Sequence, residues 1–126
     1  MIQNLPYVIS GTVVYGKQLG RKLGMPTANI FPREDIGGLD KGVYCSKITL
    51  DGKEYRAVTN LGIRPTVEDG EAVNAETYII DFEGNLYGKT IEITLVKFVR
   101  GEKRFDSLQE LKQAIKADIL LASSMK

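Results

Sequence analysis

Glycines and basic residues gather in residues 16–29 of this 126-residue chain. The glycines recur every four residues, with three bases among them: Gly16, Lys17, Gly20, Arg21, Lys22 and Gly24. Glycines let backbone N–H groups approach an anion closely, and the bases add positive charge beside it. This composition suits a loop that binds phosphate groups. It also suits a glycine-rich flap with a solvated basic tip, and the residues alone do not decide between the two.

The end of the same stretch has the chemistry of a cation site. Pro26 fixes its own φ and favours an extended Met25. In an extended chain Thr27 and Asn29 point to the same side, because they are two residues apart. A hydroxyl and an amide oxygen can then share a hard cation such as Mg²⁺ with phosphate oxygens. The alternative is that Thr27 and Asn29 serve only to form a turn.

A third candidate is Glu76, which lies in a predicted strand, Glu76–Phe82. Strand alternation places Glu76 on the face of Tyr78, Ile80 and Phe82. A carboxylate buried there without a partner would be costly. Glu76 therefore ends the strand at a barrel mouth, pairs with a base, or does chemistry. The simplest alternative, a rim residue in water, is the one that this segment alone favours.

Charges of alternating sign surround Gly101, from Arg100 and Glu102 to the aromatic Phe105. This pattern suits a flexible lid in which Phe105 packs on a flat ligand. It also suits a solvated loop in which Phe105 anchors the start of the following helix, and the local residues favour the loop.

Histidine is absent and cysteine occurs once, at Cys45. The Ser-His-Asp and Cys-His mechanisms are therefore excluded, and so is a structural zinc site. If the chain is an enzyme, we expect an Asp or Glu base and a hard, oxygen-bound metal. A single cysteine suits a reducing cytosol.

The overall charge and hydropathy give no sign of a nucleic-acid or membrane partner. The formal net charge is +1, so the chain has no general field that attracts polyanions. No run of 18 apolar residues occurs, and the first residues lack the pattern of a signal peptide. We expect a cytoplasmic protein.

The elements that must position these residues are mostly short β-rich runs. The predicted strands are Val8–Tyr15, Val43–Leu50, Lys53–Leu61, Glu76–Phe82 and Thr90–Phe98. Asp51-Gly52 predicts a type I′ hairpin turn, and residues 68–74 are expected to form a loop. Ser107 and Glu110 predict a capping box before a helix over residues 108–122. The strand spacing predicts an antiparallel sandwich or barrel in a single domain.

Seven ordered motifs along the chain match one protein family. They are G-x-V-V-x-G at Gly11–Gly16, G-R-x-L-G-x-P-T-A-N at Gly20–Asn29, G-V-Y at Gly42–Tyr44, T-N-L-G-I-R-P-T at Thr59–Thr66, E-T-Y at Glu76–Tyr78, D-F-x-G-x-L-Y-G at Asp81–Gly88, and R-x-E-x-x-F-x-S at Arg100–Ser107. Together they make nearly the whole chain resemble the riboflavin kinase (flavokinase) family. The resemblance extends to the kinase domain of bacterial FAD synthetases.

The resemblance implies an all-β fold, a six-stranded antiparallel Greek-key barrel with a C-terminal α-helix. It implies transfer of the γ-phosphoryl group of ATP to the riboflavin 5′-hydroxyl, giving FMN and ADP with the help of Mg²⁺. Residues 20–24 would lie over the phosphates, and Thr27 and Asn29 would hold the metal. Glu76 would be the catalytic carboxylate. Arg100, Glu102 and Phe105 would belong to a flap near the flavin.

Many bacterial members also carry an N-terminal adenylyltransferase domain that makes FAD. Its histidine-containing motif cannot occur here, so we expect this chain, a whole protein or a fragment of a longer one, to stop at FMN. We expect a monomer. One rival is a flavin- or nucleotide-binding barrel without catalysis, which the joint presence of Thr27, Asn29 and Glu76 argues against. The other is a nucleic-acid-binding barrel, which the low net charge and scattered tyrosines argue against.

Overall fold

A computed structural model of the protein describes residues 5–14, 27–34, 36, 39–66, 70–101 and 107–124. Six strands and one helix lie within these ranges: β1 (Tyr7–Thr12), β2 (Ala28–Ile30), β3 (Gly42–Leu50), β4 (Lys53–Thr66), β5 (Gly70–Ile79), β6 (Thr90–Gly101) and α2 (Leu108–Ser123). All the strands belong to one sheet. The described residues contain no helix that is long and apolar enough to cross a membrane.

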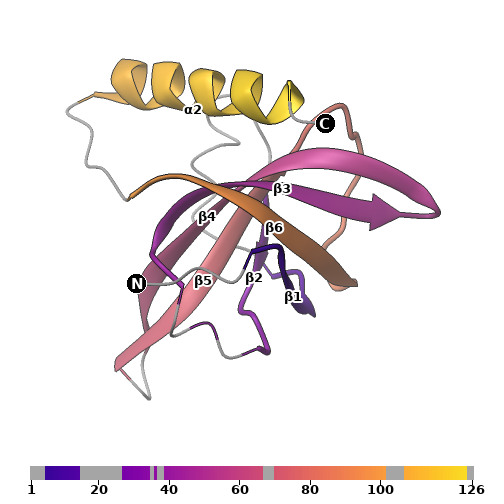
Figure 1. The fold of residues 1–126 in the computed structure, drawn as a ribbon. Helices are drawn as coiled ribbons and strands as arrows, with labels where there is room; N and C mark the ends of the chain where they lie inside the picture. Colours follow the sequence, from indigo (N-terminus) through magenta and orange to yellow (C-terminus); the bar gives the residue numbers. More distant parts are fainter. Residues whose placement is uncertain are drawn as a thin grey trace.

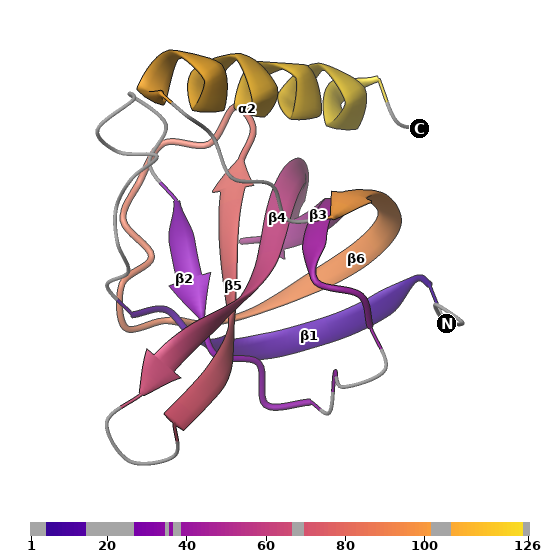
Figure 2. The same cartoon turned by 90° about the vertical axis from the view of Figure 1, so that its left-hand side faces the viewer.

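The sheet has the strand order β1-β6-β3-β4-β5-β2, and every neighbouring pair is antiparallel. It curls so that its two edge strands approach each other, as Figures 1 and 2 show. The backbone closes this gap in two places. Val14 N donates to Asn29 O at 2.8 Å, and Arg33 N donates to Ser10 O at 2.9 Å. The prediction of an antiparallel barrel of six strands is confirmed.

Two local predictions also hold in the structure. Asp51 and Gly52 both have positive φ, 51° and 80°, as a type I′ turn between β3 and β4 requires. At the start of α2, Glu110 N donates to Ser107 Oγ at 3.2 Å, which is the serine half of the predicted capping box. The turn and the cap thus fix the β3–β4 register and the first turn of the helix.

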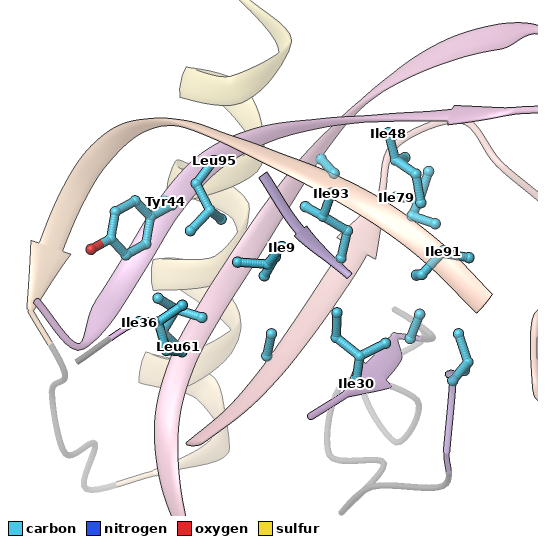
Figure 3. Packing of buried hydrophobic residues seen from close by; sticks show 14 of the residues in the cluster. Ile9, Ile30, Ile36, Tyr44, Ile48, Leu61, Ile79, Ile91, Ile93 and Leu95 are labelled. Atoms are coloured by element: carbon cyan, nitrogen blue, oxygen red, sulfur yellow. The ribbon is translucent and has the colours of Figure 1, made fainter. Parts of the chain in front are cut away.

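Apolar side chains from all parts of the curled sheet meet inside it (Figure 3). The largest of these buried apolar residues are Ile9, Ile30, Tyr44, Ile48, Leu61, Ile93 and Leu95. A second, smaller cluster joins Val43, Cys45 and Val58 on the outer face of the sheet to Ala122 and Ile119 of α2. The helix therefore packs on the outside of the barrel through one apolar side.

The structure corrects the predicted position of β5. The strand already begins at Gly70, so most of the expected loop at residues 68–74 is strand. The strand ends at Ile79, and the turn that follows has a positive φ of 62° at Asp81. The long pairing with β4, from Ala57–Ile79 to Thr66–Gly70, extends β5 in this direction. Residues that usually form turns, such as Gly70, led to the prediction of a loop and gave no indication of this pairing.

The predicted neighbours of Glu76 are only partly correct. The alternate residues Ala75, Thr77 and Ile79 are the ones that point into the barrel and are buried there. Glu76 lies on the outer face, with Asn74 two residues before it. Tyr78 shares this face, as alternation predicts, but β5 ends at Ile79, so Ile80 and Phe82 lie beyond the strand and do not continue the row.

Candidate functional site

The site is built where the short strand β2 pairs with β5. Thr27 directly precedes β2, and its Oγ1 donates a hydrogen bond of 2.6 Å to Glu76 Oε2. The two side chains are partly buried. The antiparallel register places Asn29 directly opposite Glu76. The structure thus brings together the three residues that the sequence singled out for metal binding and catalysis.

Asn29 has an unsatisfied polar atom. Its neighbours Ala28 and Ile30 are buried in the barrel core, and Asn29 itself is only 2% exposed. Its backbone carbonyl accepts from Val14 N, but its side-chain Oδ1 has no hydrogen-bond partner among the residues that the structure describes. A buried acceptor without a partner is costly and calls for an explanation. An amide oxygen in this state suits a hard cation as a ligand.

Glu76 has a second amide on its other side. On β4, Asn60 is the register partner of Glu76, so the row across three strands reads Asn29, Glu76, Asn60. Register partners in a sheet project to the same face, with their Cβ atoms roughly 5 Å apart. Asn74 lies two residues before Glu76 on the same face and donates from Nδ2 to Ile30 O at 3.4 Å.

We call this surface the polar face, and its members are Thr27, Asn29, Asn60, Asn74 and Glu76. It contains one carboxylate, one hydroxyl and three amides. Within the described ranges, no three His, Cys, Asp or Glu side chains form a group that could hold a metal. A cation at the polar face would therefore depend on Thr27, Asn29 and oxygens of a bound substrate.

Three buried hydroxyls stiffen the sheet directly behind the polar face. Ser46 Oγ lies 2.8 Å from Thr59 Oγ1, which lies 2.8 Å from Thr77 Oγ1. All three side chains are fully buried in the barrel. Thr59 and Thr77 immediately precede and follow the site residues Asn60 and Glu76 in the sequence. This ladder links β3, β4 and β5, and no feature of the sequence pointed to it beyond the polar residue types.

Arg100, expected in a flap, makes a bidentate ion pair with Asp118 of α2. Its Nη2 lies 2.9 Å from Asp118 Oδ2, and its Nε lies 3.3 Å from Oδ1. Asp118 is buried, and this pair fixes the end of β6 to the helix. The sequence contains an indication of this pair, because Asp118 lies three residues after the apolar Ile115 and therefore shares its side of the helix.

Arg100 is distant from Glu76, although both lie in one register row. Val43 pairs with Asn60 on one side and with Arg100 on the other. With strands about 4.8 Å apart, the three strand spacings between Glu76 and Arg100 amount to roughly 14 Å. The structure therefore does not place Arg100 at the polar face.

The lone thiol is not part of this site. Cys45 lies under α2, and burial raises the pKa of its thiol, which weakens it as a nucleophile. The other predicted phosphate-binding and flap residues lie outside the described residues, and their roles stay predictions. They are Gly16, Lys17, Gly20, Arg21, Lys22, Gly24, Glu102 and Phe105.

Comparison with known proteins identifies relatives over nearly the whole chain. The family model described as Riboflavin kinase, named Flavokinase, matches residues 3–126. The chain is 45% identical over 112 residues to the RNA-binding riboflavin kinase RibR of Bacillus subtilis, covering 89% of this chain and 48% of that protein. It is 43% identical over 118 residues to the bifunctional riboflavin kinase/FMN adenylyltransferase of Escherichia coli, covering 93% of this chain and 37% of that protein.

A solved structure supports the same fold. The riboflavin kinase of Trypanosoma brucei matches with a TM-score of 0.64 at 22% identity, covering 99% of this chain and 81% of that one. The chain spans less than half the length of the two curated relatives. The family model matches nearly the whole chain, and the barrel with its outer helix has the fold of a solved riboflavin kinase, so the chain belongs to the riboflavin kinase family.

Proposed function

We propose that this chain transfers the γ-phosphoryl group of ATP to the 5′-hydroxyl of riboflavin, forming FMN and ADP. The observation that carries this proposal is the 2.6 Å contact between Thr27 Oγ1 and Glu76 Oε2. It places a carboxylate beside a hydroxyl that can bind a cation, on a face that also carries the unsatisfied amide oxygen of Asn29. Family membership supplies the substrates.

In this proposal Glu76 is the base. Its Oε2 accepts from Thr27, and no described residue hydrogen-bonds to Oε1, which leaves that oxygen for the riboflavin 5′-hydroxyl. The hydroxyl oxygen attacks the γ-phosphorus, its proton passes to Glu76, and the bond to ADP breaks. A positioned base of this kind contributes roughly 10²- to 10⁴-fold in rate. The rest of the catalysis is positioning and charge stabilisation.

Thr27 and Asn29 would hold Mg²⁺ together with phosphate oxygens of ATP. The unsatisfied Oδ1 of Asn29 supports this assignment, and the Thr27 hydroxyl keeps its lone pairs while donating to Glu76. When bound, the metal would neutralise charge on the phosphates. Residues 16–24 complete the phosphate site in the proposal, as the sequence predicts.

Further activities in the names of the relatives are not transferred to this chain. The second activity in the name of the Escherichia coli relative, FMN adenylyltransferase, is not proposed for this chain, because only 37% of that protein is covered. The RNA binding in the name of the Bacillus relative is not transferred either, since the chain matches 48% of it. A cytoplasmic monomer without nucleic-acid or membrane partners stays our prediction.

The direct test is to incubate the protein with riboflavin, ATP and MgCl₂ and to separate the flavins by chromatography. The proposal predicts ATP-dependent formation of FMN, with one ADP released for each FMN. Omission of ATP and chelation of the metal are the controls. If the protein binds riboflavin or ATP but forms no FMN, the chain is a binding barrel and the proposal fails.

A further inference from the structure

We infer that Asn60 is a substrate-positioning residue that binds the hydroxylated side chain of the phosphoryl acceptor, the ribityl chain of riboflavin. The inference rests on the proposed function and adds a residue to it. It follows from the order of side chains across the polar face, where Glu76 lies between Asn29 on β2 and Asn60 on β4.

The two sides of Glu76 have different chemistry. On the β2 side, Thr27 donates to Glu76 and Asn29 presents an unsatisfied oxygen, which are the groups suited to a cation and phosphates. The phosphoryl donor therefore belongs on this side. In phosphoryl transfer the attacking and leaving oxygens lie roughly in line through the phosphorus. The acceptor must then extend away from β2, which leads over Glu76 towards β4.

Asn60 is the first side chain that an acceptor meets in that direction. Its side chain is exposed, and no described residue makes a hydrogen bond with it. An amide both donates and accepts, and so do the hydroxyl groups of a polyol. Adjacent strands are about 4.8 Å apart, so a hydroxyl held by Glu76 has its neighbouring carbons within reach of Asn60.

The surroundings of Asn60 favour a neutral ligand over a second anion. On its own face of β4, Asn60 is flanked by Val58 and Gly62. The next residue in the row, Val43 on β3, is buried in the apolar cluster under α2. No basic residue occupies these positions to bind a phosphate. Asn60 is thus followed in the row by the apolar Val43, and Arg100 beyond it is paired with Asp118. This setting suits an uncharged chain of hydroxyls at Asn60.

The test compares two acceptors, riboflavin and an analogue whose side chain keeps only the terminal hydroxyl, with wild-type protein and Asn60→Ala. We expect Asn60→Ala to lower kcat/KM for riboflavin about 3- to 10-fold, the effect of one lost hydrogen bond. The same substitution should change kcat/KM for the analogue less than 2-fold, because the partner hydroxyls are already missing. KM for MgATP should not change. Asn60→Thr, which supplies a hydroxyl that can donate and accept in place of the amide, should recover part of the activity on riboflavin.

Thr49→Ala is the matched control, since Thr49 is also exposed and polar but lies near the Asp51–Gly52 turn of the same hairpin. It should leave all constants unchanged. Equal losses on both acceptors, a changed KM for MgATP, or wild-type kinetics of Asn60→Ala would each overturn the role of Asn60. A lowered melting temperature of Asn60→Ala without recovery by Asn60→Thr would also overturn it, in favour of a structural role. Wild-type protein that forms no FMN would instead refute the proposed function itself.

Discussion

The Thr27 hydroxyl donates to Glu76 Oε2 at 2.6 Å and so joins two residues that lie 49 positions apart in the sequence. A hydroxyl has one proton to donate and two lone pairs that can accept or bind a cation. Because the proton of Thr27 points to the carboxylate, its lone pairs are available for a metal. One side chain can therefore connect the base to the phosphate site.

This arrangement predicts that Thr27→Val, which keeps the shape but removes the hydroxyl, raises the concentration of Mg²⁺ needed for activity. We expect kcat/KM for MgATP to fall at least about 10-fold, as is typical when a group that supports a metal ligand set is lost. Riboflavin binding should change little. Thr27→Ser keeps the hydroxyl and is the matched control. Steady-state kinetics over a Mg²⁺ titration measure the effect, and normal kinetics of Thr27→Val would show that the metal site is misplaced.

The partly buried pair of Arg100 and Asp118 predicts a structural role for both residues. Asp118→Ala leaves the guanidinium of Arg100 without its bidentate partner, so we expect the free energy of unfolding to fall by about 1.5–3 kcal/mol. Arg100→Ala should cost a similar amount, and the double variant should cost less than the sum. Urea denaturation followed by circular dichroism measures all three.

The control for this pair is Glu54→Ala, which removes the longer and more exposed contact of 3.8 Å between Glu54 and Lys47. Such a surface pair contributes little, and we expect a change within about 0.5 kcal/mol. If Asp118→Ala lowers the free energy of unfolding as little as Glu54→Ala does, the pair of Arg100 and Asp118 does not anchor α2 to β6.

Glu34 predicts a dependence of stability on pH. Burial disfavours its charged form, but hydrogen bonds from Ser10 Oγ at 2.5 Å and Ser10 N at 2.7 Å outweigh that effect. The pKa of Glu34 is therefore held below its ordinary value of 4.5. The carboxylate then contributes stability that is fully present above that value and is lost as the pH falls through the lower, folded-state pKa.

Glu34→Gln should accordingly be less stable than wild type at pH 7, and the difference should shrink at acid pH below 4.5. Thermal melting of both proteins between pH 7 and pH 3 measures this. Glu83→Gln is the control, because Glu83 is exposed and lies after the end of β5. A difference that stays constant over the whole pH range would contradict the role of the Glu34 carboxylate.

Local features were predicted from the sequence because their causes are local. Asp51-Gly52 specifies a turn through the φ angles that its two residues must adopt, and Ser107 caps a helix through an amide three residues away. The extended geometry of residues 27–29 follows in the same way from Pro26 and the alternation of a strand.

What could not be predicted depends on pairing between distant strands. The environment of Glu76 is set by β2 and β4, whose register with β5 brings Asn29 and Asn60 beside it. Alternation within β5 placed Tyr78 correctly on the face of Glu76, but it also placed Ile80 and Phe82 there, because it could not show that the strand ends at Ile79. The partner of Arg100, likewise, is Asp118 on a helix that packs against the sheet from outside.

The central claim, that Glu76 is the base, is tested most directly by Glu76→Gln. The glutamine keeps the size of the side chain, and its carbonyl oxygen can still accept the hydrogen bond from Thr27, but it does not take up the proton of the acceptor hydroxyl. We predict an unchanged melting temperature, nearly normal binding of riboflavin and ADP, and a kcat lowered roughly 10²- to 10⁴-fold. A near-normal kcat would show that no carboxylate base is needed, and a large loss of thermal stability would show that Glu76 has a structural role instead.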